Sequence, residues 1–291
     1  MSLRAGLAAC LAALAGSAAA AHEPWSTVQF PQDADKAWWD GRWWERGELA
    51  VPASHPVRSR AASYRNGDVE IPVEIFNPGK FPVVVFLHGR RGLDELTRLV
   101  PLRLAARGFT VVAPDLFSGR FIDKMPVRHD SALEDDAALA VDFALSLPEA
   151  RGQARTCIVS HTRGGYYALK ALVTKGRQEK AACYVSYYPH WQHPEAPEAM
   201  QVYQYAPEVD ELRVPVLVFL GEHEQYQRVR PILTGIDSLR AKKRDARVIV
   251  YPGVGRGFDF RPPEVRTLAD DLAAQDSLMR AAALMRKLLE R

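Results

Sequence analysis

The residue of this sequence that is best placed to take part in a reaction is Thr162, which lies in the stretch TCIVSHTRGGYYALKAL (156–172). Residues 156–160 are rich in β-branched and apolar side chains and predict a strand, whereas the residues from Arg163 onward predict a helix. A glycine pair in the connection predicts a sharp strand–turn–helix unit. A hydroxyl on such a turn is placed like the nucleophile of acyl transfer, provided that a neighbouring group accepts its proton.

Two later segments could supply the partners of such a nucleophile. Glu224 ends the segment LGEHE (220–224) and offers a carboxylate. Arg256 lies within YPGVGRGFDFR (251–261) and offers a guanidinium. The pKa of a guanidinium is above about 12, so Arg256 stays protonated near neutral pH and cannot accept a proton from a hydroxyl.

The elements that must position these side chains alternate between strands and helices. Apolar or alternating runs predict strands at 69–76, 83–89, 109–117 (strand and loop), 156–160, 181–187, 215–221 and 247–251. Helical patterns cover about 94–107, 133–147, 163–176, 227–242 and 265–290. This alternation predicts one α/β domain over residues 65–291, built on a doubly wound, mostly parallel sheet with helices on both faces.

Four of these segments, taken together, resemble the dienelactone hydrolase family of α/β-hydrolases. They are residues 86–117, the stretch around Thr162, and the segments that contain Glu224 and Arg256. The resemblance covers most of residues 64–290 and implies the α/β-hydrolase fold and ester or lactone substrates. It also implies a nucleophile, an acid and a histidine in that order. This chain has Thr162, Glu224 and Arg256 at those positions, where family members usually carry Cys or Ser, Asp and His.

The three departures from the family pattern differ in weight. Glu224 keeps a carboxylate, whereas Thr162 adds a methyl group on a strained turn, at a cost on the order of 1–3 kcal/mol. In α/β-hydrolases the turn that carries the nucleophile has the pattern G-x-S-x-G. Ser160 occupies the position of its first glycine and is expected to crowd the turn. Arg256 removes the base and is the decisive change. We therefore predict that hydrolysis is lost or altered and that the site binds an anionic small molecule such as a carboxylate, with binding of a protein partner as the other possibility.

Histidines elsewhere in the chain leave an alternative open. His223 is adjacent to Glu224 and could act as a non-standard base for Thr162, which would make the protein an active ester or lactone hydrolase. His190, within PHWQHPE (189–195), could act in the same way. It also forms an H-x-x-H pattern, but no third ligand follows at a readable spacing, so neither a metal nor another cofactor is predicted.

The resemblance also implies an oxyanion hole, formed by the backbone N–H groups of Arg163 and Arg90. The side chains of Arg91 and Arg256 are predicted to bind the anionic group of a ligand. In the alternative arrangement, Arg256 forms an ion pair with Glu224, and Arg91 and Arg163 point to solvent.

The N-terminal residues 1–21 predict a signal peptide and export to the periplasm or beyond. They contain Arg4, an apolar Ala/Leu run too short to remain as a membrane span, and an alanine cluster. A lipoprotein site at Cys10 is the alternative, which the very short preceding apolar stretch disfavours. Residues 22–64 predict an N-terminal arm that contains the tryptophans Trp38, Trp39, Trp43 and Trp44.

The net charge bears on possible partners, and the cysteines bear on whether the chain contains a disulfide. Removing the single charge of Arg4 lowers the formal net charge from +3 to +2, and no stripe of Lys and Arg stands out, which argues against a nucleic-acid partner. Cys157 and Cys183 lie in apolar, strand-like runs. Free buried thiols are therefore favoured over a disulfide.

Overall fold

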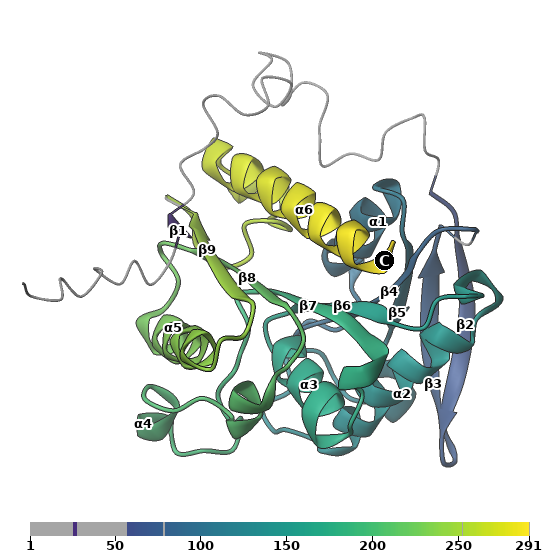
Figure 1. The fold of residues 1–291 in the computed structure, drawn as a ribbon, viewed down its shortest axis with the longest axis horizontal. Helices are drawn as coiled ribbons and strands as arrows, with labels where there is room; N and C mark the ends of the chain where they lie inside the picture. Colours follow the sequence, from purple (N-terminus) through teal and green to yellow (C-terminus); the bar gives the residue numbers. More distant parts are fainter. Residues whose placement is uncertain (1–25, 28–56, 78, 252, 291) are drawn as a thin grey trace, which may run out of the picture.

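The computed structural model describes residues 26–27, 57–77, 79–251 and 253–290. Within these residues the strands form one nine-stranded sheet in the order β1-β9-β8-β7-β6-β4-β5-β3-β2 (Figure 1). In chain order the strands are β1 (Ser26–Thr27), β2 (Ser59–Asn66), β3 (Val69–Phe76), β4 (Val83–Leu87), β5 (Thr110–Pro114), β6 (Thr156–His161), β7 (Ala181–Tyr187), β8 (Val216–Gly221) and β9 (Ala246–Tyr251).

The centre of the sheet is parallel, and one edge is antiparallel. β4 to β9 pair in parallel, whereas β3 pairs antiparallel with both β5 and β2. Every residue of β4, β5, β6, β7 and β8 is buried. This burial explains why these strands read as continuous apolar runs, as strands covered on both faces do. The doubly wound, mostly parallel sheet is confirmed.

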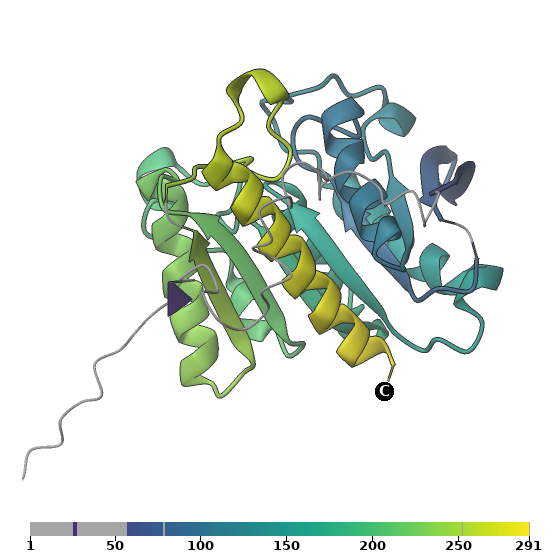
Figure 2. The same cartoon turned by 90° about the horizontal axis from the view of Figure 1, so that it is seen from above.

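Helices cover both faces of the sheet. They are α1 (Glu95–Ala106), α2 (Ala132–Ser146), α3 (Gly164–Leu169), α4 (Glu198–Gln201), α5 (Tyr226–Ala241) and α6 (Leu268–Leu289). α1 and α6 lie on one face, and α2, α3 and α5 lie on the other (Figure 1). α6 crosses the strands obliquely (Figure 2). Among the residues that the structure describes, no helix combines the length and apolar composition needed to cross a bilayer.

Helix ends follow local capping rather than hydrophobic period. α6 begins at Leu268, three residues later than the predicted start at 265. Its N-cap is Thr267, whose hydroxyl accepts from the N–H of Asp270, while the Asp270 carboxylate accepts from the N–H of Thr267. This reciprocal capping box satisfies two N–H groups that would otherwise have no partner, and it therefore defines where the helix begins.

β2 is the longest element that the sequence did not predict. It spans Ser59–Asn66 and pairs along its whole length with β3, so the predicted domain start at residue 65 falls inside this strand. Its sequence, SRAASYRN, is mostly polar because it is an edge strand with largely exposed side chains. Hydrophobic periodicity is weak in such a strand, and its pairing with β3 decides its conformation.

Cys157 and Cys183 form a disulfide, in contrast to the free thiols favoured from the sequence. The two residues occupy paired positions on the adjacent parallel strands β6 and β7, and their Cα atoms are 4.8 Å apart. That separation lies in the range that a disulfide spans. The apolar runs that contain the cysteines revealed two buried strands, but not the register that brings the sulfur atoms together.

Two predicted segments largely lie outside the described residues. They are the signal peptide at residues 1–21 and the arm at residues 22–64, of which only 26–27 and 57–64 are described. The four tryptophans of the arm are not among the described residues.

Candidate functional site

Thr162 lies on the sharp turn that was predicted between β6 and α3. Its φ angle is +46°, in the left-handed region that β-branched residues rarely adopt. Three main-chain hydrogen bonds hold it there. Its N–H donates to the Tyr187 carbonyl at 3.2 Å, and its own carbonyl accepts from Gly165 at 3.0 Å and from His190 at 2.8 Å. The surrounding structure therefore compensates for the strain at Thr162.

Glycines allow this turn to pack directly on the end of β4. A Cβ atom on Gly164 would lie 2.3 Å from the Leu87 carbonyl oxygen. A Cβ atom on Gly89 would lie 1.9 Å from the Thr162 hydroxyl oxygen. Ser160, which was expected to crowd the turn, is fully buried, and its hydroxyl lies 2.7 Å from that of Ser186 on β7. The neighbouring strand thus provides a hydrogen-bonding partner for the residue that replaces glycine.

Glu224 and Arg256 meet beyond the carboxyl ends of β8 and β9. The Arg256 guanidinium donates twice, from Nη2 to Oε1 of Glu224 at 2.9 Å and from Nε to Oε2 at 3.1 Å. The Glu224 side chain is 1% exposed, and that of Arg256 is 29% exposed. The ion pair between Glu224 and Arg256 that the alternative arrangement predicted is therefore confirmed, and it has the bidentate geometry that makes such pairs strong.

His190, beyond the end of β7, connects Arg256 to the Thr162 turn. Its main-chain N–H donates to Thr162, and its ring lies with Nε2 2.6 Å from Nη1 of Arg256. A guanidinium can only donate, so Nε2 of His190 is the acceptor and the ring is neutral. Burial, followed by the charge of Arg256, lowers the pKa of His190 well below its ordinary value. The sequence suggested His190 only as a metal ligand or a base.

Four guanidinium groups act electrostatically on the His190 ring. They belong to Arg90, Arg163, Arg228 and Arg256, and the positive charge of each opposes protonation of the imidazole. We call these four residues the arginine cluster. Arg228 lies in the first turn of α5 and was not predicted from the sequence. No local pattern marked it, because Glu224 precedes the helix and the spacing of four residues between Glu224 and Arg228 is therefore not a helical one.

Arg90 and Arg163 anchor a loop beside the site. The Arg90 side chain donates to the carbonyls of Met125 at 2.9 Å and Pro126 at 3.0 Å, and Arg163 donates to Pro126 at 3.3 Å. Within the described part of the chain, the backbone N–H groups of Arg90 and Arg163 donate to no main-chain carbonyl. Both donors therefore remain available to a ligand, and their role in an oxyanion hole stays a prediction.

Two residues proposed from the sequence lie apart from the cluster. Arg91 forms an ion pair with Asp94 at 2.5 Å, and its side chain is 47% exposed. The structure therefore does not place Arg91 among the guanidinium groups around His190. His223 is exposed, and its Cβ atom lies near the backbone of Gly255, whereas no contact with Thr162 is found in the described residues.

Two further histidines, His88 and His161, have local structural roles. His88 donates from Nδ1 to the Gly89 carbonyl at 2.8 Å, and its Nε2 accepts from the Leu116 N–H at 3.0 Å. His161 is buried with its Nε2 3.2 Å from an Asp259 carboxylate oxygen.

Asp259 connects His161 to the loop that carries Arg256. Its carboxylate also accepts a hydrogen bond from the Tyr188 hydroxyl. The buried group of His161, Tyr188 and Asp259 therefore holds the Arg256 loop against the ends of β6 and β7.

These histidines predict a dependence of stability on pH. Burial lowers the pKa of His88, His161 and His190, so these rings take up protons at a lower pH in the folded chain than in the unfolded chain. An unfolded histidine titrates near pH 6.5, so the unfolded state binds more protons below that value. We expect the free energy of unfolding to decrease from pH 6.5 to 5.5, by up to about 1.4 kcal/mol per pH unit for each histidine.

Urea denaturation at pH 7.5, 6.5 and 5.5 measures this effect. The variant His190→Gln should reduce the slope, whereas His223→Gln, at an exposed position, should leave it unchanged. An equal free energy of unfolding at pH 7.5 and 5.5 would contradict the prediction.

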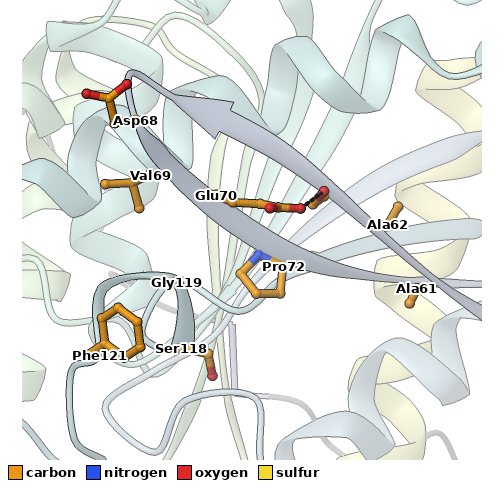
Figure 3. Close-up of a pocket in the computed structure, with 10 residues that line it drawn as sticks. Ala61, Ala62, Asp68, Val69, Glu70, Pro72, Ser118, Gly119 and Phe121 are labelled. Atoms are coloured by element: carbon orange, nitrogen blue, oxygen red, sulfur yellow. Dashed lines mark hydrogen bonds between the residues drawn. The ribbon is translucent and has the colours of Figure 1, made fainter.

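A separate hollow lies between the β2–β3 hairpin and the turn at Ser118–Arg120 (Figure 3). Its volume is about 720 Å³, and its lining includes Asp68, Glu70 and Phe121 but no member of the arginine cluster. The acidic lining makes this hollow unsuitable for an anion. Among the described residues, no group of three or more His, Cys, Asp or Glu side chains could hold a metal ion.

Comparisons with solved structures identify the fold. A dienelactone hydrolase-like promiscuous phosphotriesterase from metagenomic libraries is 19% identical, with a TM-score of 0.61 over 80% of this chain and 98% of that chain. Dienelactone hydrolase from Anabaena variabilis is 17% identical, with a TM-score of 0.59 over 81% and 100%. Brefeldin A esterase, a bacterial homologue of human hormone-sensitive lipase, is 18% identical, with a TM-score of 0.61 over 92% and 90%. These similarities show the α/β-hydrolase fold.

Family membership comes from the sequence itself. No curated protein matches the chain. The model of the dienelactone hydrolase family matches residues 71–289, which is most of the chain and includes the Thr162 turn, Glu224 and Arg256. The chain therefore belongs to the dienelactone hydrolase family of α/β-hydrolases.

Proposed function

We propose that this protein is an exported member of the family that has lost ester hydrolysis and binds a small anionic molecule beside Thr162. The observation that carries the proposal is the arrangement of Arg256. Its guanidinium is bound by both carboxylate oxygens of Glu224 and donates to Nε2 of His190. The position at which the family has its base therefore holds a permanent cation.

Loss of hydrolysis follows from the protonation states at this site. A threonine hydroxyl becomes an effective nucleophile only when a neighbouring group removes its proton. Arg256 stays protonated and cannot do so. The free electron pair of neutral His190 on Nε2 is already occupied by the hydrogen bond from Arg256. No proton acceptor is thus left for the Thr162 hydroxyl within this group of side chains.

Anion binding follows from the charges that remain. The arginine cluster contains four cationic groups, and Glu224 is the single carboxylate bound to them in the contacts described above. Guanidinium groups bind carboxylates and phosphates through paired N–H donors. The expected ligands are small carboxylates or related anions, including the products and analogues of ester or lactone substrates typical of the family.

Export is supported by the residue pattern at positions 1–21 and by the disulfide between Cys157 and Cys183. Disulfides persist in oxidising compartments such as the periplasm and the extracellular space. The protein recovered from a secreting host is expected to begin near His22. N-terminal sequencing checks this, and a recovered product that still contains residues 1–21 would refute the export proposal.

The decisive experiment for the lost chemistry is a comparison with Thr162→Ala. We expect the mature protein to hydrolyse p-nitrophenyl esters no faster than this variant, because the hydroxyl has no base. Any background from backbone donors should survive the substitution. Measuring kcat/KM for both proteins under identical conditions gives the result.

A hundredfold or larger fall in Thr162→Ala, equivalent to about 2.7 kcal/mol, would instead establish an active hydrolase. The structure offers one specific candidate for the base in that case. His190 is hydrogen-bonded through its main chain to Thr162, and its Nε2 atom would have to exchange the hydrogen bond from Arg256 for the proton of Thr162. In that case His190→Gln should abolish the activity, and His223→Gln should not.

A further inference from the structure

We infer that two copies of this chain associate through the hollow beside β2 and β3, and that Phe121 of each copy packs into the hollow of the other. This surface is separate from the site of the proposed function, because no member of the arginine cluster lines the hollow. The shape of the surface and its charges identify a second copy of the chain as the occupant.

Phe121 is exposed in a way that the contacts of its own chain do not explain. Its side chain is 97% exposed, the largest value among the large apolar side chains that the structure describes. Its φ angle is +54°, in the left-handed region that a bulky residue rarely adopts. Exposure of an apolar ring and strain of the backbone both cost free energy, and such strain clusters at functional contacts. A partner that buries the ring would offset these costs.

The turn before Phe121 holds the ring in this position. A Cβ atom on Gly119 would lie 2.5 Å from the Glu70 carbonyl oxygen, so the turn packs directly on β3. The Arg120 guanidinium donates twice to the buried carboxylate of Asp136, at 2.5 and 2.8 Å. The backbone that carries Phe121 is therefore anchored before any partner binds. A preorganised aromatic side chain loses little conformational entropy on association.

The hollow beside Phe121 is large enough to receive an aromatic ring. Its volume is about 720 Å³, and Phe121 lines it together with the β2–β3 hairpin (Figure 3). β2 is the last strand at this edge of the sheet and pairs only with β3 among the described residues. The lining includes the small or apolar side chains of Ala61, Ala62, Val69 and Pro72. A protruding ring and a hollow that can bury one thus lie side by side on one surface.

Two charges of opposite sign flank the same surface. Asp68 lines the hollow, and Lys124 lies three residues after Phe121 in the loop that follows the turn. Both side chains are exposed, and neither forms an ion pair among the residues that the structure describes. Opposite charges that do not meet within one copy can meet between two copies, which favours their association.

The combination of these features selects a second copy over a different partner. In a two-fold interface each copy supplies the same surface, so that surface must contain both halves of every contact. Here it contains the ring and the hollow, and also the acid and the base. In the dimer the two Phe121 rings lie near the two-fold axis, and Lys124 of each copy faces Asp68 of the other. Aromatic packing and opposite charges both stabilise such an arrangement.

Sedimentation velocity of the full mature protein at pH 7.5, over a wide range of protein concentration, tests this inference. We expect an equilibrium between monomer and dimer, because a surface of this size supports a weak interface. Phe121→Ser should raise the dissociation constant of the dimer by about tenfold or more, since it truncates the buried aromatic anchor. The matched control is Val265→Ser, an exposed apolar side chain between β9 and α6, which should leave the dissociation constant unchanged.

A charge exchange tests how the two copies are oriented. Asp68→Lys and Lys124→Glu should each weaken the dimer by about threefold or more, because each places like charges opposite one another. The double variant restores opposite charges across the interface and should return the dissociation constant toward that of the wild-type protein. A role of these residues in folding alone would not produce such a rescue.

Circular dichroism and urea denaturation verify that each variant is folded, and if Phe121→Ser does not fold, the charge exchange alone decides. Three results would overturn the inference. They are a chain that stays monomeric at every concentration, even if this surface captures a different protein, a dimer that is unchanged in folded Phe121→Ser, and a double charge variant that is no tighter than either single variant. A loss of the dimer in Val265→Ser equal to that in Phe121→Ser would place the interface elsewhere and would also overturn it.

Discussion

Replacing Thr162 by Ser and Arg256 by His in the same chain is expected to raise ester hydrolysis by about 10²–10⁴-fold, the usual contribution of a general base. The physical reason is that the surroundings of residues 256 and 162 already suit a histidine and a nucleophile. Glu224 is buried beside residue 256 and would orient an imidazole there as it now orients the guanidinium. The turn at residue 162 is already held by main-chain hydrogen bonds and packed on the end of β4.

The single variants are the controls for this prediction. Thr162→Ser removes only the extra methyl group, and Arg256→His supplies a base for a hindered hydroxyl. Each should raise kcat/KM for p-nitrophenyl acetate by less than about tenfold, because nucleophile and base act as a unit. A double variant no more active than either single variant would show that residues 162 and 256 are not positioned to cooperate.

Replacing Arg256 by Ala is expected to lower the free energy of unfolding by up to about 3–5 kcal/mol, the loss seen when one partner of a fully buried ion pair is removed, because Glu224 is buried but Arg256 is 29% exposed. The substitution leaves the Glu224 carboxylate, which is 1% exposed, without its two hydrogen bonds from the guanidinium. It also removes the donor to Nε2 of His190, a second buried polar atom. Urea denaturation at pH 7.5 measures the loss.

Two comparisons isolate the cause of that loss. Arg213→Ala breaks an exposed ion pair with Glu179, whose side chains are 59% and 87% exposed, and it should cost about 1 kcal/mol or less. The double variant Arg256→Ala with Glu224→Gln should be more stable than Arg256→Ala alone, because it leaves no buried charge unpaired. If Arg256→Ala costs no more than Arg213→Ala, the buried pair does not have the role assigned to it here.

The two experiments concern different consequences of one arrangement. A guanidinium at residue 256 stabilises a buried carboxylate and excludes proton transfer at the same position. Restoring the histidine is therefore expected to exchange stability for activity, a trade-off common at functional sites. The free energies of unfolding of Arg256→His and of the double variant, compared with their kcat/KM values, show how much stability is lost for the activity gained.

The sequence by itself determined the fold class and the central pair of the site. Hydrophobic period is a local property, so VVVFL (83–87) and AACYVSY (181–187) reveal buried strands without knowledge of their neighbours. The segments around Glu224 and Arg256 could be aligned with the family pattern because each motif is contiguous in the chain. Their order then predicted the ion pair that the structure contains.

The tertiary structure alone decided the rest, because these features depend on contacts between residues far apart in the chain. The disulfide requires the register of β6 against β7, and β2 becomes a strand by pairing with β3. His190 accepts from a guanidinium 66 residues later, so the sequence could suggest His190 as a base but not this hydrogen bond. Arg228 joins the cluster only because the carboxyl ends of parallel strands and the helices that follow them meet at one edge of the sheet.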